Sequence, residues 1–220
     1  MRGRPGTDIT ACMPASRPTP EPAAHSSGTR RRGSSLTGAI YRTTLKELAE
    51  NGFDRLSFDK IAAAAGTGKA SLYRRWTTPA ELVLAALTDP VSGFGDVPRP
   101  DSGSLRGDLV FLLGAFARIL EHEPHGRALL PLITQHRRHP ELYTNVRRLI
   151  IEPRQQLILD ILRAAADRGE AEATAITPHI AAVGPRLVIA ELLDHGSVTP
   201  DEIDAIVDEV LMPLLARRYS

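Results

Sequence analysis

The sequence predicts an all-α protein with a small N-terminal group of helices and a larger C-terminal helical domain. Two observations carry this prediction. Apolar residues recur at helical spacing wherever a regular pattern exists, and no sustained alternation of apolar and polar residues favours a strand. A Gly- and Pro-rich stretch at residues 90–104 separates the two groups of helices.

Length and composition are those of an ordinary globular protein. The chain has 220 residues, 42% of them hydrophobic and 24% charged, so it can bury a core without disulfides or metals. The single cysteine, Cys12, excludes an internal disulfide and any zinc site that needs two cysteines. No apolar run reaches the roughly 18–20 residues of a membrane span, and residues 1–33 lack the apolar stretch of a secretion signal. We therefore expect a cytoplasmic protein that does not associate with membranes.

Charge is distributed unevenly along the chain. The net charge is +1, but residues 1–85 carry 13 Lys and Arg against 7 Asp and Glu, whereas residues 86–220 carry 14 against 19. The N-terminal part is therefore basic (+6) and the remainder acidic (−5). A basic end indicates an anionic partner there, and the acidic remainder argues against a nucleic-acid groove along the whole protein.

Residues 1–33 are expected to form a disordered basic arm. They contain five of the 17 prolines, many small polar residues and a closing run of arginines at 30–32. Such a composition buries too little apolar surface to offset the entropy of ordering. The arginines could also enter a minor groove, so a DNA-binding protein that tolerates many sequences through its arm is an alternative function.

Three short helical patterns follow, and each ends at a glycine or at an aromatic residue. The first stops at Gly52, the second begins after Ser57 as its N-cap and stops at Gly66, and the third spans about 69–76. Their apolar stripes, at spacings of three and four residues, comprise Tyr41, Leu45, Leu48 and Ala49, then Phe58, Ile61, Ala62 and Ala65, then Leu72 and Trp76.

The second and third helices have the form of a helix-turn-helix DNA reader. The tight turn 66–68 joins them, and the third helix places Lys69, Ser71, Arg74 and Arg75 opposite its apolar stripe. A single helix fits the major groove, where its N-terminal residues reach bases and its cationic groups hold phosphates. A helical hairpin within an ordinary bundle is the alternative interpretation of the spacing alone.

A fourth helix completes the N-terminal domain, predicted at 34–88. Thr78, Pro79 and Glu81 have the spacing of a capping box with proline in the first turn. The C-terminal domain, 89–220, contains further helical periods around Leu109 to Phe116, at 127–135, at 141–168 with an interruption at Pro153, at 178–194, and at 201–217. Pro213 is expected to kink or end the last helix.

The N-terminal motifs resemble those of TetR-family transcriptional regulators. The resemblance covers about residues 35–86 and rests on Gly52-Phe53-Asp54, on Ser57-Phe58-Asp59-Lys60-Ile61-Ala62, on the run AGTGKASLYRRW that begins at Ala65, and on Ala80-Glu81-Leu82. The remainder resembles a TetR-type C-terminal domain more weakly, through His139-Pro140-Glu141-Leu142 and Gly184-Pro185.

The resemblance implies a homodimer that binds a double-stranded, pseudo-palindromic operator and a small-molecule effector that releases DNA. It assigns contacts with bases or phosphates to Ser57, Gly68, Lys69, Ala70, Ser71, Tyr73 and Arg74. Two residues depart from the family pattern, namely Gly68 where many members have serine and Pro79 where many have a phosphate-binding lysine. Gly68 predicts a weaker cap for the third helix, unless Thr67 replaces it. Pro79 removes the lysine's phosphate contact, although the helix N-terminus there can still attract a phosphate. Asp59 is expected to face away from DNA or to pair with a helix dipole.

The resemblance also assigns dimerisation to the last two helices, although their apolar faces could instead complete the core of one chain. The expected interface comprises Val183, Leu187, Val188, Ile203, Ile206, Val207, Val210, Leu211 and Leu214. Candidates for an effector cavity, each of which could equally be plain core, are Phe111, Phe116, Leu129, Leu132, Tyr143, Leu157 and Ile161. Because this domain has few aromatics and no visible cluster of buried charge, we expect an uncharged or lipophilic effector.

Enzymatic alternatives have weak support in the sequence. His122 and His125, and likewise His136 and His139, have a spacing that could bind a metal with Glu121 or Glu123, but each pair adjoins a proline and is expected at a frayed helix end. The run that begins at Gly66 lacks the earlier glycine and the hydroxyl residue of a phosphate-binding loop. We therefore expect no catalytic residues, no metal and no cofactor.

Overall fold

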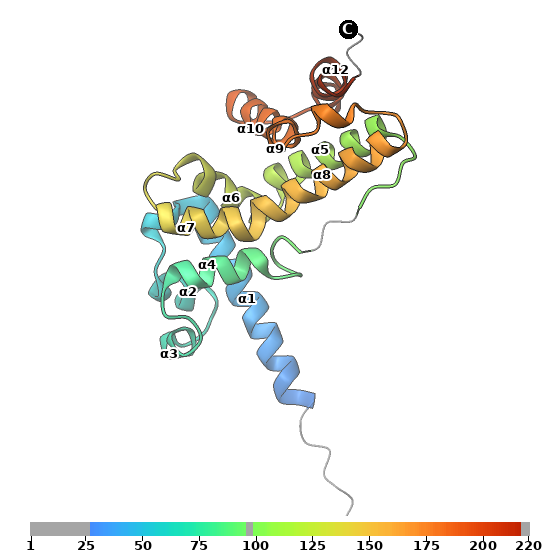
Figure 1. The fold of residues 1–220 in the computed structure, drawn as a ribbon. Helices are drawn as coiled ribbons and strands as arrows, with labels where there is room; N and C mark the ends of the chain where they lie inside the picture. The colour runs from blue at the N-terminus through green and yellow to red at the C-terminus, as the bar shows by residue number, and fades with distance from the viewer. Residues whose placement is uncertain (1–26, 96–98, 217–220) are drawn as a thin grey trace, which may run out of the picture.

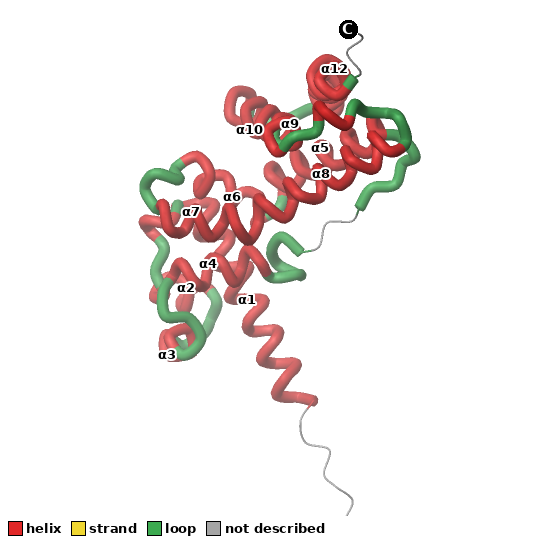
Figure 2. Tube along the Cα trace, viewed as in Figure 1, coloured by secondary structure: helices red, strands yellow, loops and turns green. Residues whose placement is uncertain are grey.

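A computed structural model describes residues 27–95 and 99–216 of the chain (Figure 1). Throughout these residues the chain is helix, turn or loop without strands, which confirms the predicted all-α fold (Figure 2). No helix in the described ranges is long and apolar enough to cross a bilayer.

The N-terminal helices form the predicted helix-turn-helix head. Its elements are α1 (Ser27–Asn51), the short 3-10 turn η1 (Phe53–Arg55), α2 (Phe58–Ala64), α3 (Lys69–Tyr73) and α4 (Pro79–Thr88). Helix α1 begins at Ser27, before the expected start of the N-terminal domain at residue 34. Residues 1–26 of the expected arm lie outside the described residues.

Helix caps within the head match the sequence pattern in part. The Ser57 hydroxyl accepts from the Lys60 amide, and the Thr78 hydroxyl accepts from the Glu81 amide at 3.2 Å. The reciprocal half of the predicted capping box is different, because the Glu81 carboxylate accepts from the amide of Thr77, at 2.6 Å, and not from that of Thr78. Glu81 therefore fixes the chain one residue before the N-cap.

The C-terminal half contains longer helices joined by short turns. Its elements are α5 (Leu105–His122), α6 (Pro124–Thr134), α7 (Pro140–Val146), η2 (Arg147–Ile151), α8 (Glu152–Asp167), η3 (Ala173–Ala175), α9 (Pro178–Ala181), α10 (Val183–His195), α11 (Pro200–Ala205), η4 (Ile206–Leu211) and α12 (Met212–Leu215).

Helical structure continues past two prolines, Pro153, which was expected to interrupt a helix, and Pro213, which was expected to kink or end one. A π-helical turn, η2, lies directly before the turn that contains Pro153, and a second, η4, lies directly before the turn that contains Pro213. A π turn shifts the hydrogen-bond register by one residue, which relieves the clash and the missing donor that proline brings to an α-helix. The helices 140–167 and 200–215 are therefore continuous.

The described residues pack into two hydrophobic clusters whose boundary differs from the predicted domain boundary. The first contains α1 to α4 together with Phe94 and with buried residues of α6, α7 and η2, such as Leu129 and Val146. The second contains α5, α8, α10, α11, η4 and α12. The head thus shares its core with helices beyond residue 88, and α6 packs directly on α1 (Figure 1).

Truncation of Leu129 tests this shared core. Leu129→Ala should lower the free energy of unfolding by about 2–5 kcal/mol, because the side chain is 2% exposed and its removal leaves a cavity. Urea denaturation measures the loss. Hydrogen exchange should accelerate in α1 as well as in α6.

Phe111→Ala is the control, because Phe111 is 53% exposed and should change stability by no more than about 0.5 kcal/mol. Unchanged protection of α1 in a destabilised Leu129→Ala protein would contradict a shared core.

Candidate nucleic-acid interface

Helix α3 is held on the head by one apolar face and leaves the opposite face accessible. Leu72 is 0% and Trp76 8% exposed, and the Trp76 ring lies 5.8 Å from that of Tyr41 on α1. Lys69, Ala70, Tyr73 and Arg74 are exposed, and Ser71 is half-buried. The orientation predicted from the spacing is confirmed.

The turn before α3 leaves that helix's N-terminus without a side-chain cap. Gly66 adopts a left-handed conformation, with φ at +64°, which ends α2. Gly68 is the N-cap of α3 and offers no oxygen to the first amides, and Thr67 does not replace it. The first amides of α3 therefore lack a side-chain acceptor at the positive end of the helix dipole.

The structure places Asp59 in the first turn of α2, the position expected of a helix-dipole partner, and pairs it with Lys69 of α3. The Lys69 ammonium pairs with the Asp59 carboxylate at 2.5 Å, and both side chains are more than half exposed. A pair this exposed contributes little stability, because water screens it. It does hold Lys69 toward α2 and offsets its charge.

Two aromatic residues position the C-terminal end of α3. Tyr73 is 59% exposed and rests edge-on against Phe58, with ring centroids 4.8 Å apart. This contact aims the phenol outward. Arg75 donates to the Thr37 hydroxyl of α1, which fastens the end of α3 to the longest helix of the head.

The predicted DNA-contacting residues lie on or beside the two helices of the helix-turn-helix. Gly68, Lys69, Ala70, Ser71, Tyr73 and Arg74 belong to α3 or its caps, and Ser57 begins the adjoining helix α2. The Ser57 hydroxyl already caps α2, so any phosphate contact would share that oxygen.

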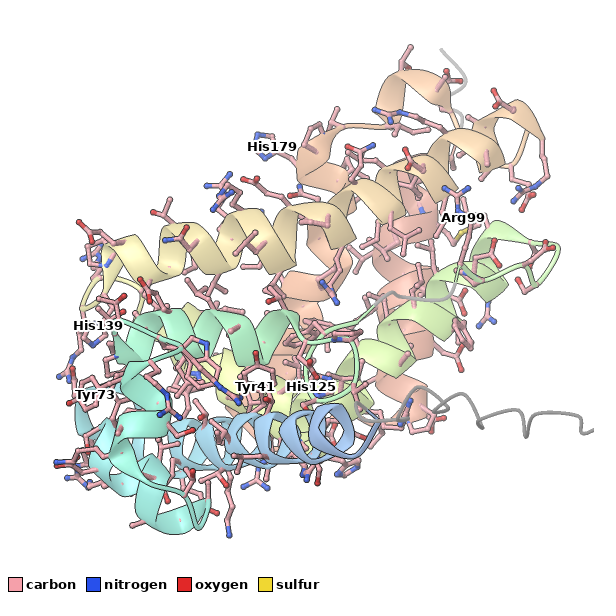
Figure 3. The ribbon with its side chains drawn as sticks, turned by 90° about the horizontal axis from the view of Figure 1, so that it is seen from below. Tyr41, Tyr73, Arg99, His125, His139 and His179 are labelled. Carbon is pink, nitrogen blue, oxygen red and sulfur yellow. The ribbon has the colours of Figure 1, made fainter. Side chains whose placement is uncertain are left out.

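A polar junction that the sequence did not reveal joins this head to the loop before α7. The Asp54 carboxylate of η1 accepts from His139 Nε2 at 2.7 Å and from Arg138 at 3.1 Å. The His139 ring also stands edge-on to Phe53, with centroids 4.6 Å apart. Figure 3 shows His139 and Tyr73 at the same end of the molecule. His139 is thus an inter-domain contact and not a frayed end in solvent.

The candidate effector residues do not line a common cavity. Phe111 lies at the surface, Leu129 and Leu132 belong to the head core, and Ile161 belongs to the second core. Tyr143 and Leu132 line a small pocket with Phe53, whereas Phe116 and Leu157 pack at the margin of the second core. Periodicity placed these residues on inward faces but could not tell which core each face joins.

A different apolar cavity lies in the second core. It measures about 10 Å³ and is lined by Leu109, Leu112, Ile158, Leu162 and Gly184 among others. This volume holds about one water molecule, so an effector would have to separate the surrounding helices.

The expected dimer residues divide into two sets. Val188, Ile203, Ile206, Val207 and Leu211 are at most 6% exposed within the single chain, so the assignment of these five to a surface for a partner is wrong. Val183, Leu187, Val210 and Leu214 are half-buried and remain partly accessible. Leu193 on α10 is 55% exposed but is not among the predicted interface residues, because the sequence around it does not distinguish an outward leucine from an inward one.

Metal-ligand geometry occurs away from the histidine pairs. Glu191, His195 and Glu202 bring ligand atoms within 4.8 Å of one another in the described part of the chain. Each already has a partner, because Glu191 pairs with His195 and Glu202 completes a capping box with Thr199. His136 instead contacts the Ile133 carbonyl, and His125 packs on Phe94.

Comparison with known proteins identifies the family of this head and its helical partner domain. Residues 40–86 match the profile of bacterial regulatory proteins of the tetR family, and residues 99–210 match the tetracyclin repressor-like C-terminal domain. An uncharacterized HTH-type transcriptional regulator of Mycobacterium tuberculosis (strain ATCC 25618 / H37Rv) is 36% identical over 179 residues, which cover 81% of this chain and 87% of that protein.

The chain belongs to the TetR family. It is a DNA-binding transcriptional regulator with a helix-turn-helix, as the resemblance implied. The DNA-binding transcriptional repressor TetR of Mycobacteroides abscessus is 31% identical, with 84% of this chain and 96% of that protein covered.

Solved structures of the TetR family share the fold. NalD, the secondary repressor of the MexAB-OprM multidrug efflux pump in Pseudomonas aeruginosa, has a TM-score of 0.62 at 19% identity and covers 86% of this chain and 100% of its own. A TetR family transcription regulator at 24% identity has a TM-score of 0.59, with 83% and 100% covered.

The junction between head and α7 should make stability depend on pH. The hydrogen bond from His139 holds the pKa of Asp54 below its usual value, with a smaller contribution from Arg138. A carboxyl with a lowered folded pKa stabilises the fold above its unfolded pKa of about 3.9, and this contribution is lost as pH falls through the lower folded pKa.

Asp54→Asn should therefore lower the urea midpoint at pH 6 and show a smaller further loss between pH 5 and pH 3 than the unsubstituted protein. Asp167→Asn is the control, because this exposed carboxylate makes no hydrogen bond or ion pair within the described ranges. Equal pH dependence of the Asp54→Asn and unsubstituted proteins would show that the junction does not contribute to the stability of the head.

Proposed function

We propose that this TetR-family regulator is a homodimeric, ligand-responsive repressor of a pseudo-palindromic operator, acting in the cytoplasm. The observation that carries the proposal is the outward face of α3, where Lys69, Ala70, Tyr73 and Arg74 lie opposite the buried Leu72. A relative in Mycobacteroides abscessus bears the name of a DNA-binding transcriptional repressor, which supports repression as the mode of action.

The chemistry of α3 suits a combination of phosphate and base contacts. Arg74 offers a planar fork of donors that matches phosphate oxygens or a guanine edge, and the phenol of Tyr73 can donate to a phosphate. Lys69 starts the helix beside Asp59, and DNA would have to compete with that carboxylate for the ammonium. Ala70 lacks a polar group and suits an apolar contact with a thymine methyl.

A homodimer suits a pseudo-palindromic operator, because its two heads can reach half-sites about 34–36 Å apart, or a multiple of that distance. The outward side of α10 offers a surface for the partner, since Ile189 is half-buried and Ala190 and Leu193 are exposed on successive turns. The accessible Val183 and Leu187 begin the same helix.

The apolar lining of the small cavity in the second core favours an uncharged or lipophilic effector. Its walls come from α5, α8, α9, α10, η4 and α12, so a ligand that enlarged it would move several helices at once. Such motion could reach the head, because α5 is joined to α6, whose residues belong to the head core.

Substitution of the exposed α3 residues tests the DNA contacts. Arg74→Ala should weaken binding to the operator by about 1–3 kcal/mol and lower the salt slope by about one if the guanidinium holds a phosphate. Tyr73→Ala should weaken binding with an unchanged salt slope, because the phenol is neutral and releases no counterion. Fluorescence anisotropy with DNA from the gene's own upstream region, against a scrambled duplex, measures both effects.

Arg163→Ala is the matched control, since this exposed arginine on α8 pairs only with Asp160 among the described residues. Retained discrimination by a folded Arg74→Ala protein would remove Arg74 from the DNA interface. Salt-sensitive binding of equal strength on both duplexes would instead favour the sequence-tolerant alternative.

The oligomeric state has its own test in Leu193. Leu193→Asp should convert the dimer to monomer in sedimentation velocity, because it places a charge at the centre of the outward face of α10. Val91→Asp is the control, because Val91 is 87% exposed but lies after α4. A Leu193→Asp protein that sediments as an unchanged dimer would show that this face is not the interface.

A further inference from the structure

Arg154 on α8 has a set of partners unlike that of any other described arginine. Its guanidinium donates to three backbone carbonyls, those of Ile150 at 2.9 Å, of Phe94 at 3.1 Å and of Gly95 at 3.1 Å. The first belongs to its own helix segment. The other two belong to the segment that follows α4, so Arg154 bonds across the chain to the end of the head.

The same guanidinium covers an aromatic ring of that segment. Arg154 Cζ lies 4.7 Å from the ring centroid of Phe94, in the position of a cation–π contact. On another side, the ring of His125 from α6 meets Phe94 edge-on at 4.6 Å and 82°. Phe94 is 8% exposed and is part of the head core. Helices α6 and α8 therefore hold it from two directions.

The segment that Arg154 binds, residues 89–95, is fixed to the end of α4 by hydrogen bonds and close packing. The Phe94 amide donates to the Leu87 carbonyl at 2.7 Å, and the Asp89 carboxylate accepts from the amides of Val91 and Ser92. Gly93 packs so closely on α4 that a Cβ there would lie 2.3 Å from the Ala86 carbonyl oxygen. A displacement of this turn would therefore carry the end of α4 with it.

Arg154 binds carbonyl oxygens and an aromatic ring, and not a carboxylate. Among the carboxylates in residues 27–95 and 99–216, none lies within ion-pair distance of Arg154, so its described partners are carbonyl dipoles and a ring. Burial lowers the pKa of His125, which keeps this neighbour neutral near pH 7. An arginine stays charged even when half-buried, and lysine cannot reproduce its planar fork.

We propose that Arg154 is a positioning residue for DNA binding. It fixes the end of α4 to α8 through the Phe94 and Gly95 carbonyls and the Phe94 ring, and thereby sets the position of the DNA-reading head on the C-terminal half. The proposal rests on the operator binding proposed above, and Arg154 itself contacts no DNA in it. Helix α4 transmits the constraint because it packs on α1, which carries Tyr41 against Trp76.

The test compares Arg154→Met with Arg154→Lys and with Arg163→Met, a control on the same helix. Arg154→Met keeps most of the apolar stem but removes the donors, so operator affinity should fall about tenfold at a temperature well below the midpoint of thermal unfolding. Hydrogen exchange should accelerate at the amides of Gly93 and Phe94 while the amides of α3 stay protected. Arg154→Lys should recover part of the affinity, and Arg163→Met should match the unsubstituted protein.

A merely structural role for Arg154 would give a different pattern. Arg154→Met would then lower the unfolding temperature, and the folded fraction would bind the operator with unchanged affinity, which overturns the proposal. Affinity that is unchanged despite faster exchange at Gly93 and Phe94 overturns it as well.

Phe94→Leu adds a second measurement. The double variant Phe94→Leu with Arg154→Met should lose less affinity than the two single losses combined, because both remove the same contact. Additive losses would show that the ring and the guanidinium act separately.

If the unsubstituted protein fails to discriminate the operator, the proposed function itself fails. Operator binding that depends on Arg74 but not on Arg154 rejects the positioning role alone.

Discussion

Helix α6 packs on α1, and the core of the DNA-reading head is incomplete without it. Buried residues of α6, α7 and η2 join those of α1 to α4 in one hydrophobic cluster, whereas α5 and α8 carry the other. Burial of apolar surface is the main stabilising contribution to such a cluster, so the head cannot separate from α6 without exposing it. Helix α5, which joins α6 directly, is thereby tied to both cores.

The boundary of the head is polar as well as apolar. Asp54 binds His139 and Arg138 and so joins the head to the loop before α7. Phe94 contacts Arg154 and His125 and so joins the end of the head to α8 and α6. The apolar core sets which helices lie together but tolerates small rotations, because hydrophobic burial has no direction. Hydrogen bonds and ring contacts have direction, so these two groups orient the head.

Charge within the reading surface is offset at Lys69, which pairs with Asp59. Arg74 and Arg75 are exposed and keep their charge, because the Thr37 hydroxyl that accepts from Arg75 is neutral. The two arginines at the end of α3 are therefore the cations that are available for phosphates, and the start of the helix contributes less.

The sequence by itself determined the class of fold, the place of the helix-turn-helix and the inward or outward direction of each α3 side chain. These properties depend on local periodicity and on caps such as Ser57 and Thr78, which act within a few residues. Only the tertiary structure decided which core each helix joins. Leu129, predicted in an effector cavity, lies in the core of the head, and Ile203, predicted at a dimer interface, lies in the second core. It also decided the partners of Asp54, Asp59 and Arg154, because those contacts join residues that are distant or on separate helices. The continuity of the helices at Pro153 and Pro213 also belongs to this second group, since a π turn precedes each proline where proline alone predicts a break.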